Sequence, residues 1–223
     1  MDLHLWVAYL AAAVLIALSP GSGAVLSITH GSQHGVRGAS AAIAGLEGGL
    51  LAILLVAGLG VGSLLVASER AFWAVKVAGA CYLFYLGVQQ WRSTGSLLPG
   101  TISSTAPDAQ GGPAGGEARP SWGSRFLTGF LTNVTNPKGI VFMVAVLPQF
   151  IDPARPLALQ LLILSVTTLS VDVVVMHGYA LFGRALRQLL QSPRAARWQR
   201  RIFGGFFMAL GTGLLFVQRH RQG

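Results

Sequence analysis

Three ionisable side chains lie well inside long apolar stretches of this sequence, whereas a fourth, Lys76, is expected to reach the membrane interface. Glu47, Lys138 and Asp172 each stand alone in a run of otherwise uncharged residues. Placing an ion in hydrocarbon costs roughly 3 kcal/mol on insertion scales, so such residues pair with one another or face a watery cavity. They are candidates for taking up a proton or holding a charged solute.

Lys138 and Asp172 carry opposite charges near the centres of their stretches, which predicts a contact between them. Such a contact could be a structural pair, or a gate for which substrate ions compete. His177 follows shortly after Asp172 and could relay protons, although a lone histidine is more often a hydrogen-bonded packing residue.

Glu47 is surrounded by glycine, at Gly45, Gly48 and Gly49. Small residues allow close helix packing in a membrane, and they would leave room beside the carboxyl group. The pattern predicts an acid that a proton-coupled carrier could use. The alternative interpretation is a polar tether between helices.

Two proline–glycine elements each fall inside an apolar stretch. Proline removes one backbone hydrogen bond and clashes with the preceding turn, so both helices should be kinked or interrupted. Free backbone groups at membrane depth persist where they line a cavity or bind something; the alternative is a plain packing kink. The candidate substrate-binding residues are Ser19, Pro20, Gly21 and Ser22 at the first break and Asn136, Pro137 and Lys138 at the second.

The elements that must position these residues are predicted to be transmembrane helices. The 223 residues are 52% hydrophobic and only 10% charged, against about 25% charged in soluble domains. A span needs roughly 20 mostly apolar residues, and continuous apolar runs favour helices over strands. The predicted fold is an all-α integral membrane protein with six transmembrane helices, in the stretches Leu5–Thr29, Gly38–Ser68, Ala71–Trp91, Phe126–Ile151, Leu157–Gly183 and Ile202–Gln218.

Residues 94–124 are the one predicted linker, because glycine, proline, serine and threonine dominate there and such a segment buries too little surface to fold. The linker separates helices one to three, in residues 1–93, from helices four to six, in residues 125–223. Each half begins with a broken helix, continues with a helix that holds one acid and ends with a glycine-rich helix. With three helices each, the halves would be inverted repeats, a common transporter design.

The chain has a net charge of +9. The positions of its basic residues indicate membrane topology rather than a surface that binds nucleic acid. Arginines are concentrated on the side of the membrane that holds Arg37, the linker and residues 184–201. Cytoplasmic loops carry such an excess, so both termini are predicted to be periplasmic. The sequence shows no metal-ligand spacing, nucleotide loop or hydrolase triad, which argues against an enzyme, a metal site or a cofactor.

Several motifs resemble those of the lysine exporter / homoserine–threonine resistance superfamily of amino-acid exporters, along nearly the whole chain. The most specific are the Asn-Pro-Lys element and the Leu-Pro-Gln-Phe tetrapeptide at their separation. The motifs that carry the resemblance are Leu18–Gly21, the basic turn Gly35–Gly38, Gly79–Gly87, Gly129–Lys138 and Leu147–Phe150.

This resemblance implies six helices, homodimers, and efflux of amino acids or related small metabolites across the bacterial inner membrane, with a proton as the antiported ion. It also implies that Pro20, Gly21 and the Asn136–Lys138 element belong to a central site. Free amides at a half-helix start would hold the substrate carboxylate. Ser22 is a departure, because the family usually has a second proline there, and it makes the choice of substrate less predictable from relatives.

Two other functions are compatible with a polytopic membrane protein. A channel would need a polar stripe along its pore, whereas this sequence has isolated polar residues, which favours a carrier. A membrane scaffold or assembly factor that transports nothing would make the intramembrane acids dispensable. The identity of the amino acid, the coupling stoichiometry and the dimer interface do not follow from the sequence.

Overall fold

The computed structural model describes residues 1–67, 69–92, 120–152, 154–183, 185 and 193–216. Every regular element in these ranges is helical, which confirms the predicted all-α class for this part of the chain. The elements are α1 (Leu3–Leu18), α2 (Ser22–Ala67), α3 (Glu69–Arg92), α4 (Trp122–Val134), α5 (Pro137–Val146), the 3-10 helix η1 (Leu147–Phe150), α6 (Leu157–Leu181) and α8 (Pro193–Phe216).

Two of the described helices are long and apolar enough to span a membrane. They are α2, over Ser22–Gly60, and α6. A third span results if α4 and the segment Pro137–Phe150, which meet at a bend of 54°, cross as one broken helix. The helix α1 is apolar but shorter.

Helix α2 is a hairpin of two helices. Its 46 residues would extend about 69 Å at 1.5 Å per residue, more than twice the thickness of the hydrocarbon core. Gly35 interrupts it with a φ of 69°, a conformation that glycine adopts at little cost. Ser27 and Ser40, on opposite sides of Gly35, contact the adjacent α6 residues Met176 and His177, so the two halves lie side by side.

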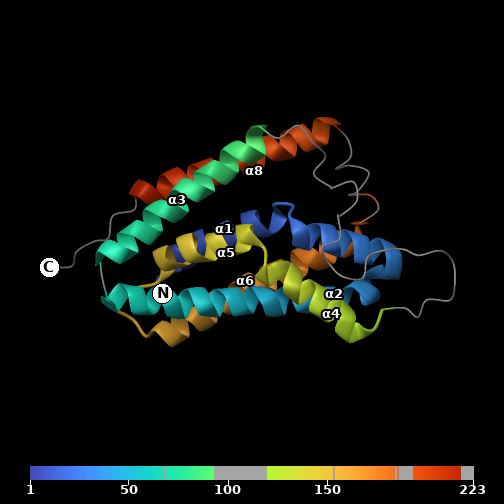
Figure 1. Ribbon diagram of the computed structural model, residues 1–223, viewed down its shortest axis with the longest axis horizontal. Helices are drawn as coiled ribbons and strands as arrows, with labels where there is room; N and C mark the ends of the chain where they lie inside the picture. Colours follow the sequence, from blue (N-terminus) through green and yellow to red (C-terminus); the bar gives the residue numbers. More distant parts are fainter. Residues whose placement is uncertain (68, 93–119, 153, 184, 186–192, 217–223) are drawn as a thin grey trace.

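The helices are arranged around the two short half-helices α1 and α5. In Figure 1, α3 and α8 run alongside each other along one side of the molecule, and they pack together. The helices α2, α4 and α6 lie on the opposite side (Figure 1), where α2 packs against both α4 and α6. The principal apolar core joins α1, α2, α5 and α6 to α3 and α8 through residues such as Leu54, Leu83 and Phe207.

The glycines that flank Glu47 pack α2 against α4. A Cβ atom at Gly45 would overlap the carbonyl oxygen of Phe126, and one at Gly49 would lie 2.8 Å from that of Phe130. The two backbones therefore approach closely, as small residues allow in membranes. The predicted close packing is confirmed, and the space beside these glycines is occupied by α4.

Two helix boundaries differ from the sequence-based expectation. The last helix begins at Pro193 rather than Ile202, so the cluster of arginines after Pro193 lies on a helix and not in a loop; proline is well suited to a first helical turn. Helix α4 begins at Trp122, with Ser121 as its N-cap, and so includes the last residues of the expected linker. The rest of that linker, to residue 119, lies outside the described residues.

Candidate functional site

The two predicted helix breaks are present, and they share one local cause. Ser19 and Asn136 each precede a proline and each have an extended backbone, with ψ angles of 115° and 105°. A residue before proline is sterically pushed out of the helical region. The chain therefore leaves the helix between Leu18 and Ser22, and again between Val134 and Pro137, which confirms that both elements are interruptions.

The breaks lie against each other, although they are far apart in the sequence. The Lys138 ammonium group donates hydrogen bonds to the Ser19 carbonyl oxygen at 3.0 Å and to the Ser19 Oγ at 2.8 Å. The Tyr179 hydroxyl donates to the carbonyl oxygen of Leu18 at 2.8 Å. Side chains from α5 and α6 thus satisfy carbonyl groups that the first break releases, as buried backbone groups require.

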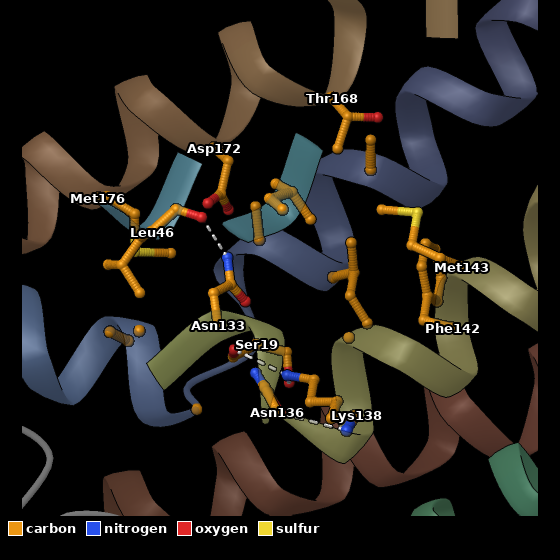
Figure 2. A pocket seen from close by; sticks show the side chains of 18 residues that line it. Ser19, Leu46, Asn133, Asn136, Lys138, Phe142, Met143, Thr168, Asp172 and Met176 are labelled. Atoms are coloured by element: carbon orange, nitrogen blue, oxygen red, sulfur yellow. Dashed lines mark hydrogen bonds between the residues drawn. The ribbon is translucent and has the colours of Figure 1, made fainter. Parts of the chain in front are cut away.

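A cavity of about 80 Å³ lies where the breaks meet. That volume holds several water molecules, and Figure 2 shows the side chains that surround it. The predicted residues that line it are Ser19, Gly21, Asn136, Lys138 and Asp172. The remaining lining residues are Ala13, Ile16, Ala17, Gly23, Ala24, Leu46, Leu50, Asn133, Gly139, Phe142, Met143, Thr168 and Met176.

The expected contact between Lys138 and Asp172 is not a direct ion pair. Among the described residues, the ion pairs join Arg155 to Asp2 and to Asp152. Lys138 and Asp172 face the same cavity and interact electrostatically across it. The physical reason is that the break at Ser19 gives the ammonium group two nearer oxygen acceptors.

Glu47 lies beside Asp172 and does not line the cavity. Both of its carboxyl oxygens are buried and meet no hydrogen-bond donor in the described part of the chain. Two carboxylates have no proton between them, so a hydrogen bond joins this pair only when one group is protonated. The sequence predicted each acid separately and did not predict that they meet.

Besides Glu47, four other predicted site residues lie outside the cavity lining. Pro20, Ser22 and Pro137 shape the breaks without lining the cavity. His177 lies on the side of α6 that faces α2, where its Nε2 is 3.3 Å from the Ser40 hydroxyl and its Nδ1 is 2.8 Å from the Val173 carbonyl oxygen. A proton relay through His177 stays a prediction.

Asn133 and Thr168 are site residues that the sequence reasoning missed. Asn133 has no sequence signal from Asn136, because the helix ends between them. Thr168 has one, because it stands one helical turn before Asp172 within α6. Residues at this spacing share a helix face. Asn133 also donates from its Nδ2 to the Leu46 carbonyl oxygen at 2.6 Å.

Two aromatic side chains of the half-helix α1 form hydrogen bonds with α6. The Thr167 and Thr168 hydroxyls donate to the carbonyl oxygens of Ile163 and Leu164 within α6. Each threonine oxygen can then only accept from α1, and the donors are the Trp6 Nε1, at 3.0 Å, and the Tyr9 hydroxyl. Because Thr168 also lines the cavity, the Tyr9 contact joins α1 to α6 at the cavity wall.

We expect Tyr9→Phe to loosen this contact, because it keeps the ring and removes the donor. A hydrogen bond contributes about 0.5–1.5 kcal/mol, so access to the cavity should rise about threefold to tenfold. A cysteine at Ala13, which lines the cavity, reports the change through its rate of maleimide modification in a Cys81→Ser background. Tyr85→Phe, at an exposed tyrosine of α3, is the control. An unchanged rate in Tyr9→Phe would show that this hydrogen bond does not limit access.

Apolar helices of spanning length, with two helix breaks that meet around a cavity lined by Lys138 and Asp172, are the arrangement that membrane transporters use. The chain belongs to the LysE type translocator family, whose pattern matches residues 14–218.

Several curated proteins are similar to the chain along its whole length. It is 41% identical to a homoserine/homoserine lactone efflux protein of Salmonella typhi over 220 residues, which cover 99% of this chain and 100% of that protein. It is 39% identical to an uncharacterized membrane protein of Vibrio cholerae, over 97% of this chain and 98% of the relative. No solved structure matches the chain.

Proposed function

We propose that the protein is a secondary transporter that exports small amino acids, or closely related metabolites, across the bacterial inner membrane. The observation that carries the proposal is the meeting of the two broken helices around a cavity that holds both a cation, Lys138, and an anion, Asp172. Broken helices at membrane depth are the usual location of transporter substrate sites.

The cavity supplies partners for both charged groups of an amino acid. Helix α2 begins at Ser22 and α5 at Pro137, and helix N-termini favour anions. Lys138 adds a positive charge close to Gly21, within 3.8 Å of where a Cβ would stand there. A substrate carboxylate would bind here, and Asp172 would hold the substrate ammonium group.

The relatives suggest the kind of substrate. The Salmonella typhi protein is named for the efflux of homoserine and homoserine lactone, which are small molecules with a single ammonium group. A cavity with one lysine and one aspartate in its lining suits a solute with a single ammonium group. We therefore propose homoserine and its lactone as the first candidates to assay.

Six spans in two inverted repeats are the topology that fits this proposal. The spans would be α1 with the first half of α2, the second half of α2, α3, α4 with α5, α6 and α8. The packing supports a two-fold relation, because α1 packs on α6 as α4 packs on α2, and α3 packs on α8. In this proposal the chain between α3 and α4 links the halves in the cytoplasm, both termini are periplasmic, and two copies form a homodimer.

Glu47 and Asp172 would provide the coupling site. Their carboxyl groups adjoin each other beside the cavity, so one proton bound between them would be released or taken up as a substrate ammonium group binds Asp172. Exchange of a proton for an amino acid at one place is the requirement for antiport.

A direct test is the efflux of preloaded, labelled homoserine from cells that express the wild type or Glu47→Gln. We expect export that a proton uncoupler stops, and a loss of about tenfold or more in Glu47→Gln because glutamine cannot exchange a proton. Asp2→Asn is the control, since it removes an exposed acid far from the cavity.

Three results would change the proposal. Export that does not saturate with substrate would indicate a channel. Export that the uncoupler leaves intact would remove proton coupling. No export of any amino acid by protein shown to be in the membrane would favour a scaffold or assembly factor.

A further inference from the structure

The two asparagines of the second break use opposite ends of their amide groups. The amide nitrogen of Asn133 is already hydrogen-bonded, because Nδ2 donates to the Leu46 carbonyl oxygen at 2.6 Å. In Asn136 the amide oxygen is the hydrogen-bonded atom, because Oδ1 accepts from the Lys138 backbone N–H at 3.1 Å and so caps the N-terminus of α5. A carbonyl oxygen can only accept and an N–H can only donate, so these partners fix which way each amide is turned.

The atoms left over face the cavity with opposite polarity. Asn133 retains its Oδ1, an acceptor, and Asn136 retains its Nδ2, a donor. Both atoms lie beside Gly139 in the cavity wall, 3.8 Å and 3.9 Å from where a Cβ would stand there. Neither is needed for the helix cap or for the contact between α2 and α4.

Each asparagine lies near one of the two charged residues of the cavity. In Figure 2, Asn133 lies toward Asp172, and Asn136 lies next to Lys138 and Ser19. Asn133 therefore adds a free acceptor to the part of the lining near Asp172, and Asn136 adds a free donor to the part near Lys138. Because both free atoms lie beside Gly139, one small solute could contact them together.

We propose that Asn133 and Asn136 fix the orientation of the substrate, with Asn133 Oδ1 accepting from its ammonium group and Asn136 Nδ2 donating to its carboxylate. Asn136 is then the residue by which the site distinguishes an amino acid from a derivative without a free carboxylate, such as its lactone. Asn133 does not make this distinction, because the ammonium group is common to both. This inference rests on the proposed function.

The test compares L-homoserine and L-homoserine lactone as competitors of the labelled amino acid that the wild type exports. Asn136→Asp keeps the N-cap, because aspartate caps as well as asparagine does, but replaces the donor with a negatively charged acceptor. We expect inhibition by homoserine to weaken at least about tenfold relative to inhibition by the lactone, the usual cost of losing a hydrogen bond to a charged group. Asn136→Ser keeps an N-cap residue without adding charge, but its hydroxyl is too short to donate from the position of the amide Nδ2, so it should shift the ratio in the same direction by less.

Two further variants complete the design. Asn133→Ala should weaken both competitors about equally. Ser121→Asp changes the N-cap of α4, where the side chain accepts from the Ser124 N–H on the exposed surface, and should leave the ratio at the wild-type value.

The outcomes separate this inference from the function on which it rests. Equal weakening of both competitors in Asn136→Asp and Asn136→Ser, or a changed ratio in Asn133→Ala, would overturn the assigned roles while amino-acid export stands. A wild type that neither compound inhibits would overturn them as well. A wild type that exports no amino acid would overturn the proposed function and this inference together.

Discussion

Export should fall to background when Lys138 is replaced by methionine. The ammonium group makes two hydrogen bonds to Ser19, and it is the only cation in the described cavity wall. Hydrogen bonds to charged groups are worth about 1.5–3 kcal/mol each, and each 1.4 kcal/mol is a factor of ten. Methionine removes the hydrogen bonds that join the two breaks, and it removes the positive charge that would bind the substrate carboxylate. We expect efflux of labelled homoserine from cells to fall by about a hundredfold.

Lys138→Arg separates the two roles of this residue. Arginine keeps the positive charge, but its planar guanidinium group does not reproduce the two bonds of a compact ammonium group. We expect export between that of the wild type and that of Lys138→Met. Full export by Lys138→Met, with normal amounts of protein in the membrane, would remove Lys138 from the site.

The largest effect on stability is expected from Gly129→Ala. A Cβ atom at Gly129 would overlap the Ala42 carbonyl oxygen of α2, so the two helices must move apart. An alanine in a helix is otherwise favoured over glycine by about 1 kcal/mol, whereas overpacking costs typically 1–3 kcal/mol. The variant should therefore unfold at a lower temperature in detergent and lose export, because Asn133 is held on the Leu46 carbonyl at this same contact.

Gly123→Ala is the matched control in the same helix. The nearest atom to a Cβ at Gly123 is the Ser121 Oγ at 4.0 Å, so the added methyl group meets open space. This variant should be as stable as the wild type or slightly more stable. Equal melting temperatures for Gly129→Ala and Gly123→Ala would contradict the close approach of α2 and α4.

The same contact shows why the surroundings of Glu47 were only half predicted. Glycines beside an acid indicated close helix packing, and that is what Gly45 and Gly49 provide. The space beside these glycines is filled by α4, which is distant in the sequence, so local patterns do not predict it. The carboxyl group of Glu47 is directed instead toward Asp172, a residue on α6 that no local pattern could pair with it.

The sequence by itself determined the features that depend on a residue and its immediate neighbours. The apolar runs predict helices, the prolines interrupt them after Ser19 and Asn136, and Gly35 allows α2 to turn back. These outcomes are local because steric clashes and missing N–H groups act within one turn of helix.

The tertiary structure alone decided which groups meet. Lys138 was expected at Asp172, yet its ammonium group bonds to Ser19, and the amide of Asn133 is oriented by the Leu46 carbonyl oxygen of α2. Such choices depend on where backbone carbonyls become free once the helices have packed, since a buried donor takes the acceptor that lies within reach. The residue types therefore determine which chemistry is available, whereas the packing of α2, α4, α5 and α6 arranges these residues around the proposed substrate site.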